Sequence, residues 1–269
     1  MPGIWSIMCS PYPPISNPVG DINVGPVRKV PWHVRPTHFA LLVVWAGFLL
    51  VLLSGTWGWA DDGFSTIHGT VRFSGAVPPP TIVNVLKDPE HCGAQVAIQS
   101  VKVQGSAGAL EGAIVSLEGM FPMKELPANP DRPVVNAHCA FTPRVIGAQT
   151  GQDVEVRNQD PILHNTHIKL GKRTFLNVAQ VPNGRPIMKM LKQPGHYSIK
   201  CDKHTFMEGH LVVFSHPFFS VTDSSGSFHL AQVPPGTYQL QVWHETLGYL
   251  TQPLEIAAQS VRRLDLVYP

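Results

Sequence analysis

The sequence predicts an all-β protein. The 26 prolines and 23 glycines among its 269 residues disfavour long helices, because both residue types destabilise helix interiors. Short alternating or β-branched runs recur between turn signals, and no stretch combines helical periodicity with capping residues. Many short strands separated by Gly- and Pro-rich turns are typical of β-sandwiches and barrels.

Composition excludes several other classes of protein. Hydrophobic residues make up 43% of the chain and its net charge is only +2, which argues against intrinsic disorder. Four cysteines are too few for a disulfide scaffold of this length. With 20 basic and 18 acidic residues the chain has no strong field for phosphates, so we expect no nucleic-acid partner. The length allows one or two domains.

Residues 1–60 are expected to form an N-terminal tail followed by an export segment. The run Phe39–Leu53 is uninterrupted and apolar, follows three basic residues, and precedes small residues that end at Ala60. This order predicts a signal peptide cleaved after Ala60. An uncleaved membrane anchor is the alternative, and would be the chain's link to a membrane. In either case residues 61–269 are expected to work outside the cytoplasm, where disulfides persist.

The exported part contains ten candidate strands. In chain order they are Ile67–Phe73, Val101–Gln104, Ala113–Leu117, Val154–Arg157, Tyr197–Cys201, Leu211–Phe214, Phe218–Thr222, Ser227–Leu230, Tyr238–Trp243 and Val261–Leu266.

The densest candidate site is a loop with the pattern Cys201-x2-His204-x2-Met207, leading into a strand. Thiolate and thioether ligands favour Cu(I), and imidazole accepts both copper oxidation states. His164, 37 residues upstream, would supply a second imidazole. A zinc half-site is the alternative, but zinc sites are built from Cys, His and carboxylate ligands rather than Met.

The wider pattern resembles a cupredoxin, a type 1 blue copper protein with a Greek-key β-sandwich. The residues that carry this resemblance are Gly151-x2-Val154-x-Val156-x-Asn158-x-Asp160-x3-His164-Asn165-x-His167 and Gly195-x-Tyr197-x3-Cys201-x2-His204-x2-Met207-x-Gly209. The short ligand loop is similar to that of amicyanin rather than plastocyanin. The resemblance covers about residues 134–215. It implies one copper ion with His164, Cys201 and His204 as equatorial ligands and Met207 as the axial ligand.

The same resemblance gives two nearby residues a role. Asn165 directly follows a ligand and would help to pin the two ligand loops together, as a second shell does. His204 would lie where the copper comes nearest the surface, with Phe206 supplying apolar contact for electron transfer. His167 is expected to be a structural residue rather than a ligand, because on a strand it points away from the face of His164.

The expected function is single-electron transfer between periplasmic redox partners, such as a dehydrogenase or a cytochrome. A site filled by four protein ligands has no open position for a substrate. No two of the 13 histidines are separated by a single residue, so His-x-His motifs for a catalytic copper are absent. We therefore expect a carrier and not an enzyme. The alternatives are a module that stores, delivers or senses copper, and a structural module with a vestigial site.

Cys92 and Cys139 each follow a histidine. A disulfide between them is expected in an oxidising compartment. The alternative is a second metal site of two Cys and two His residues.

Residues 216–269 resemble a carboxypeptidase-regulatory-like (transthyretin-like) β-sandwich module. The resemblance is carried by the pattern Thr222-Asp223-x2-Gly226-x-Phe228 and then Pro234-x-Gly236-x-Tyr238-x-Leu240. We expect a cupredoxin region over 61–215 and this smaller module after it. Strands within 62–120 either lead the cupredoxin region or open the tail sandwich, with the cupredoxin inserted after about residue 120.

Overall fold

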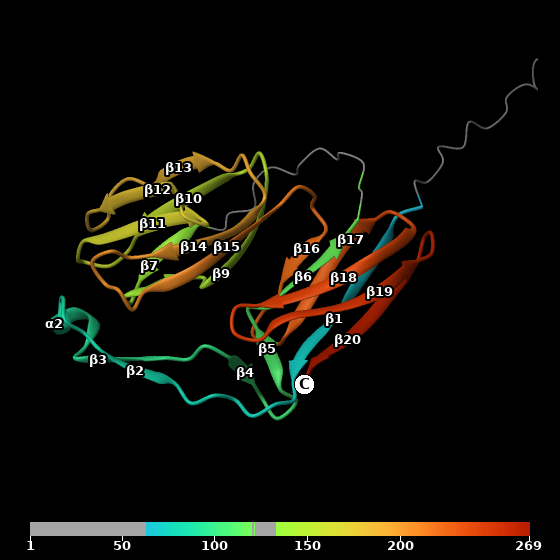
Figure 1. Ribbon diagram of the computed structural model, residues 1–269, viewed down its shortest axis with the longest axis horizontal. Coiled ribbons are helices and arrows are strands. Elements are labelled where there is room, and N and C mark those ends of the chain that lie inside the picture. The colour runs from blue at the N-terminus through green and yellow to red at the C-terminus, as the bar shows by residue number, and fades with distance from the viewer. Residues whose placement is uncertain (1–62, 120, 122–132) are drawn as a thin grey trace, which may run out of the picture. The chain divides into compact units, whose positions relative to one another are not determined.

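The computed structural model describes residues 63–119, 121 and 133–269, and these residues confirm the predicted all-β class (Figure 1). They form strands in two β-sandwiches, a separate hairpin and a helix of four residues. The expected export segment, within residues 39–60, lies outside the described residues. In the described ranges, no helix has the length and apolar character needed to cross a membrane.

The first sandwich, here called the split sandwich, is built from two separated parts of the chain. One sheet has the order β17-β1-β5-β4 with β20 also paired to β1, and the other has the order β16-β6-β18-β19. Alternating positions of the strands face a shared core that includes Val71 and Val242. Its strands are β1 (Ser65–Phe73), β4 (Lys102–Gln104), β5 (Ala109–Glu111), β6 (Ile114–Glu118), β16 (Phe219–Val221), β17 (Ser227–Val233), β18 (Gly236–His244), β19 (Gly248–Ile256) and β20 (Val261–Tyr268).

Strand pairing joins the two parts of the split sandwich. β1 pairs with β17 and in parallel with β20, while β6 pairs with β16 and β18. The leading strands of residues 62–120 therefore lie in one sandwich with strands of the tail. The β1–β20 pairing depends on Gly69, since a Cβ there would lie 1.6 Å from the carbonyl oxygen of Leu264.

The second sandwich, here called the inserted sandwich, is formed by the chain between β6 and β16. Its sheets have the orders β13-β10-β7-β8 and β12-β11-β14-β15-β9. Residues such as Val156 and Ile168 pack from the two sheets into one core. Its strands are β7 (Val134–Ala137), β8 (Ala140–Thr142), β9 (Val145–Gln149), β10 (Asp153–Asn158), β11 (His164–Leu170), β12 (Arg173–Gln180), β13 (Ile187–Met190), β14 (Gly195–Lys200) and β15 (Glu208–Phe214).

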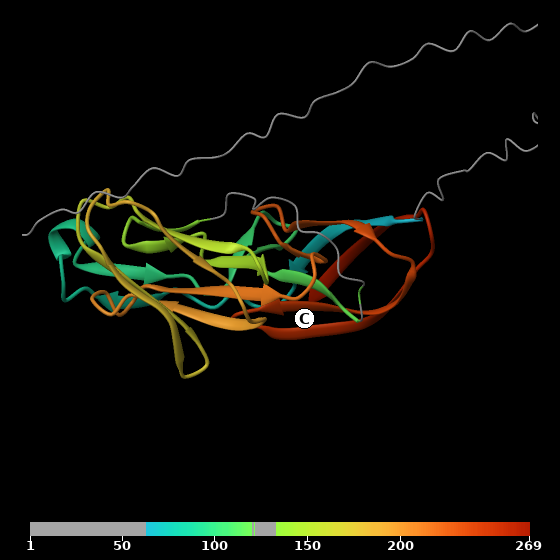
Figure 2. The same ribbon diagram turned by 90° about the horizontal axis from the view of Figure 1, so that it is seen from above.

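An excursion of the split sandwich reaches the inserted sandwich. Between β1 and β4 the chain forms β2 (Thr81–Asn84), α2 (Pro89–Cys92) and β3 (Gln95–Ile98), and β2 pairs only with β3 among the described strands. We call residues 76–100 the arm, and Figures 1 and 2 both show it running beside the inserted sandwich. A disulfide between Cys92 of α2 and Cys139, in the turn from β7 to β8, fastens the arm there.

His216 lies in the connection from the inserted sandwich back to the split sandwich. Its ring packs against Phe121, Phe214 and Phe218, and its Nδ1 accepts the backbone N–H of Phe218 at 3.2 Å. Because the ring is buried, loss of solvation lowers its pKa to about 4.

This depressed pKa predicts acid sensitivity at the connection. The neutral ring is the form that the fold holds, so its contribution to stability is complete above pH 6.5 and is lost as the pH falls toward about 4. Relative to a His216→Asn variant, which keeps an acceptor for the Phe218 N–H, the parent should lose about 1.4 kcal/mol of unfolding free energy per pH unit in that window. Urea denaturation from pH 7 to 4 measures this difference. Parallel pH profiles of the two proteins would contradict the assignment.

Candidate metal site

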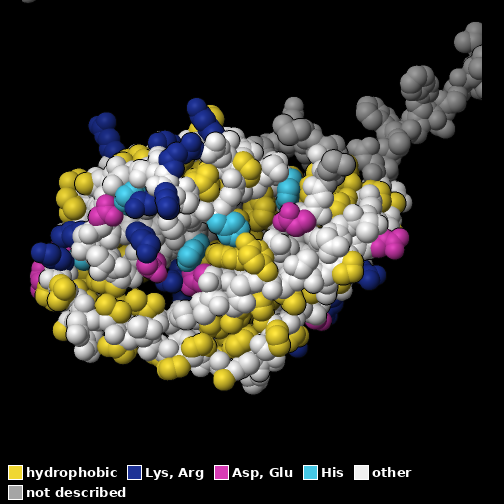
Figure 3. Space-filling view, viewed as in Figure 1, with side chains coloured by type: hydrophobic (Ala, Val, Ile, Leu, Met, Phe, Trp, Pro, Cys, Tyr) yellow, Lys and Arg dark blue, Asp and Glu magenta, His cyan; other side chains and the backbone are white. Residues whose placement is uncertain are grey.

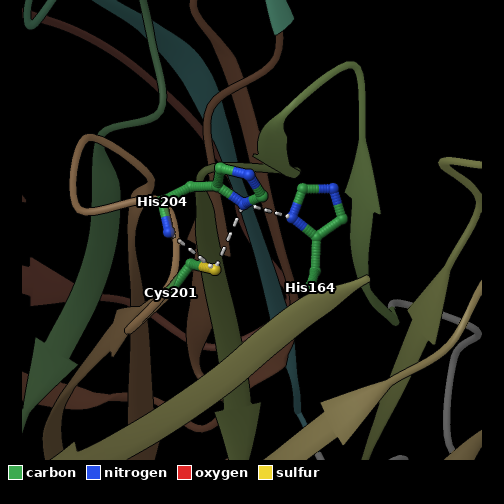
Figure 4. A group of neighbouring side chains, drawn as sticks. All are labelled: His164, Cys201 and His204. Carbon is green, nitrogen blue, oxygen red and sulfur yellow. Dashed lines mark hydrogen bonds between the residues drawn. The ribbon is translucent and has the colours of Figure 1, made fainter. Parts of the chain in front are cut away.

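Three of the four predicted ligands converge at one end of the inserted sandwich. His164 begins β11, Cys201 directly follows β14, and His204 lies in the loop that leads to β15. The Nδ1 atoms of the two histidines are 3.0 Å apart, and Cys201 Sγ lies 3.6 Å from Nδ1 of His204 (Figure 4). All three side chains are buried, with 0–1% of their surface exposed. Two imidazole nitrogens and a sulfur therefore face a common point.

Met207, the predicted axial ligand, ends the same loop. It is 2% exposed and belongs to the same buried cluster as Cys201. The loop closes on itself, because the Met207 N–H donates to the His204 carbonyl at 2.9 Å and the Cys201 N–H donates to the Met207 carbonyl at 3.3 Å.

Backbone amides surround the cysteine sulfur. The N–H groups of Asn165 and His204 donate to Cys201 Sγ at 3.4 and 3.3 Å. Both amides are directed at the sulfur that would bind a metal. The Asn165 side chain also joins the two ligand segments, since its Oδ1 accepts the backbone N–H of Asp202 at 3.1 Å. This is the bridging position expected for Asn165.

Asp160 orients His164 from behind. Its Oδ2 lies 2.7 Å from His164 Nε2, and its carboxylate accepts the backbone N–H groups of His138 and Cys139 at 2.7 and 2.9 Å. Burial alone would raise the pKa of Asp160, but these donors outweigh it and the pKa is lowered. The carboxylate therefore stays ionised, and acts as an acceptor for His164.

The turn that supplies those two amides has a demanding backbone. His138 and Cys139 both have positive φ, 54° and 55°, in the two-residue connection between β7 and β8. Glycine or asparagine usually occupies such positions, because side chains disfavour them. Here the carboxylate of Asp160 and the disulfide to Cys92 hold the turn in place.

Asp88 plays the corresponding part for His204. This arm residue, 116 positions away in sequence, places Oδ2 2.7 Å from His204 Nε2 and 2.6 Å from Lys203 Nζ. The Lys203 ammonium and the His204 bond hold the pKa of Asp88 below its ordinary value, although burial opposes them. The sequence contains no local signal for this contact.

The arm covers the outer edge of His204. Asp88 contacts Nε2 of this residue, and His204 is 1% exposed. The expected role of His204 as an electron-transfer contact, where the copper comes nearest the surface, stays a prediction. Phe206, the other residue of that predicted surface, is half-buried with its ring centroid 5.9 Å from that of His204. It lines a cavity of about 330 Å³ between β3 and the inserted sandwich, and Figure 3 shows the surface hollowed along this boundary.

Other histidines and cysteines have different partners. His167 Nδ1 lies 3.1 Å from Asp202 and its Nε2 lies 2.9 Å from Thr174 Oγ1, away from the ligand cluster. A second group of donor atoms, from His91, Cys139 and Asp160, also lies close together. Since Cys139 is in the disulfide, it has no thiolate to offer a metal there.

The hydrogen bonds from the two imidazoles to Asp88 and Asp160 indicate what the site can bind. A carboxylate can only accept, so Asp88 and Asp160 require an N–H on Nε2 of His204 and His164 respectively. In a neutral ring the Nδ1 atom then carries a bare lone pair. Two such lone pairs 3.0 Å apart, beside the sulfur of Cys201, repel one another unless a cation lies between them. The donor set therefore fits a cation that takes nitrogen and soft sulfur ligands.

Comparisons with known proteins give low similarities. No protein-family model and no curated protein matches the sequence. A Cu-containing nitrite reductase (NirK) from Thermus scotoductus SA-01 is 22% identical over 36% of this chain, with a TM-score of 0.29. The match spans only 24% of that enzyme. A purple cupredoxin from Nitrosopumilus maritimus is 19% identical over 28% of this chain and 81% of its own, with a TM-score of 0.25. An amicyanin mutant with Cu(I) is 21% identical over 31% and 81% of the two chains, with a TM-score of 0.29. Similarities this low assign no function to the chain.

The role of Asp160 predicts a large stability difference between two aspartates. Asp160→Ala removes a buried carboxylate and strands the donors around it, so the metal-free protein should lose about 3–5 kcal/mol of unfolding free energy. Asp202→Ala is the control, because that side chain is 54% exposed and pairs with His167 at the surface; its loss should be about 1 kcal/mol or less. Equal losses in urea denaturation would contradict the buried role of Asp160.

Proposed function

We propose that this protein is an exported type 1 copper protein that carries single electrons between periplasmic redox partners. The observation that carries the proposal is the convergence of Nδ1 of His164, Nδ1 of His204 and Sγ of Cys201 in a buried site. One copper ion would be held by these residues with Met207 as the axial ligand. Bound copper would supply a one-electron Cu(I)/Cu(II) couple.

The donor chemistry favours copper over zinc. Structural zinc sites close with Cys, His or carboxylate ligands. Here the fourth candidate is the thioether of Met207, buried beside Cys201, and a weak axial Met is typical of a blue copper centre. The carboxylates Asp88 and Asp160 face the outer nitrogens of the imidazoles and are not in ligand positions.

The same geometry supports a carrier rather than an enzyme. Two imidazoles, one thiolate and one thioether would occupy the positions around the copper, and each is at most 2% exposed. A substrate would have no open ligand position and little access. Hydrogen bonds from Asp160, Asp88 and Asn165 hold the ligand segments in place. They would limit the rearrangement of the ligands when the charge of the ion changes.

Export has independent support from the disulfide. Cys92 and Cys139 are bonded, and disulfides persist in oxidising compartments such as the periplasm. The proposed partners, a dehydrogenase or a cytochrome, follow from this compartment and from the electron-carrying role.

The cover over His204 favours a second candidate function. A ligand edge that is 1% exposed suits a site that stores, delivers or senses copper and exchanges electrons slowly. The two functions differ in the rate at which the copper cycles between its oxidation states.

Copper loading tests the proposal directly. Residues 61–269 loaded with Cu(II) should show an intense visible thiolate-to-copper absorption band that bleaches on reduction and returns on reoxidation. Cys201→Ser should abolish the band, because it removes the thiolate. If the parent shows no such band, or if the band survives Cys201→Ser, the copper assignment is wrong. A band that forms but does not cycle would favour storage or delivery.

The axial ligand has its own test. Met207→Gln should retain copper but lower its reduction potential, since an oxygen donor at the axial position favours Cu(II) over Cu(I). Met190→Gln on β13 is a matched control, because that side chain is 50% exposed at the surface. Potentiometric titration of the absorption band measures both variants. An unchanged potential in Met207→Gln would remove Met207 from the axial position.

A further inference from the structure

The helix α2 begins with an aspartate that does not cap it. Asp88 is at the N-cap position, where an aspartate side chain ordinarily accepts an N–H from the first turn. Its side chain makes no such bond, and its backbone has a φ of 51°, which is unusual for a residue other than glycine. The carboxylate is directed to His204 and Lys203 instead. Local helix stability therefore does not account for its position.

We propose that Asp88 is a positioning residue for the metal ligand His204, so that a residue outside the inserted sandwich completes the copper site. This inference rests on the proposed copper function and adds a residue that determines the properties of the metal. Its chemistry is that of a carboxylate–histidine–metal triad.

The contact with Asp88 selects one tautomer of His204. Asp88 Oδ2 accepts from Nε2 of His204, which leaves Nδ1 bare and directed at Cys201 Sγ and His164. Without this acceptor the buried ring could carry its proton on either nitrogen, and only one tautomer can bind metal through Nδ1. The contact also fixes the rotation of the ring.

The carboxylate of Asp88 would also change the reduction potential of the copper. A carboxylate that accepts from a ligand imidazole makes the imidazole a stronger donor. A stronger donor and a nearby negative charge stabilise Cu(II) more than Cu(I), and so lower the reduction potential. Lys203, 2.6 Å from Asp88, offsets part of that charge.

The arm is anchored close to the proposed metal site. The Cys92–Cys139 disulfide holds α2 beside the turn between β7 and β8. His91 of the same helix lies 3.6 Å from Asp160, the residue behind His164. The arm is thus fixed next to both ligand histidines, and it can hold Asp88 in a defined place.

The test compares two variants of Asp88 with Glu90→Gln, which changes an exposed carboxylate of the same helix. Asp88→Ala removes the acceptor, and should lower copper affinity about 10–100-fold in competition with a chromogenic Cu(I) chelator. Asp88→Asn retains an oxygen acceptor without the charge, so it should bind copper more tightly than Asp88→Ala but with a reduction potential above that of the parent. Glu90→Gln should match the parent in both measurements.

A measurement without copper completes the test. Nitrogen-15 NMR of the metal-free protein should show His204 with its proton on Nε2 in the parent, and a mixture of tautomers in Asp88→Ala. If both Asp88 variants match Glu90→Gln in affinity, potential and tautomer, the positioning role is refuted while the copper site stands. If the parent itself forms no blue copper band, the proposed function fails, and the NMR result separately decides whether Asp88 orients the ring.

Discussion

The site depends on two hydrogen bonds from buried imidazoles to carboxylates. Asp160 accepts from Nε2 of His164 and Asp88 accepts from Nε2 of His204, so in their neutral forms both rings would present bare Nδ1 atoms to one another. This arrangement is costly without a cation, because the lone pairs and the sulfur of Cys201 converge at a buried point. The surrounding structure offsets this cost. Backbone amides hold the carboxylate of Asp160, Lys203 holds that of Asp88, and the disulfide fixes the turn that supplies the amides.

The topology explains how both carboxylates reach the site. Asp160 belongs to the inserted sandwich and lies four residues before His164, so the local chain supplies it. Asp88 comes from the arm, which leaves the split sandwich after β1 and returns at β4. The split sandwich is closed by pairing of β1 with β17 and β20, on either side of the insertion. One sandwich therefore carries the proposed metal ligands, and the arm of the other covers His204.

Local patterns allowed the sequence to predict the all-β class and the grouping of His164, Cys201 and His204. The Cys201-x2-His204-x2-Met207 loop is short, and its chemistry is visible without a fold. Several strands were missed because they lack the expected alternation of apolar residues. β11 contains His164, Asn165 and His167, and β19 contains Pro253 at the edge of its sheet, where a proline is tolerated. Asp88 could not be predicted, since its contact with His204 spans 116 residues and depends on the path of the arm.

The cover also changes the route by which an electron would leave the proposed copper. An exposed imidazole edge would meet a redox partner directly, but here the outer nitrogen of His204 meets Asp88 first. The Asp88 side chain is 21% exposed, so it is a polar group that both contacts the ligand and reaches solvent. A partner that approaches this end of the inserted sandwich would therefore contact the arm as well as the ligand loop. In the proposed function, the arm would therefore affect both the docking of a partner and the hydrogen bonding of His204.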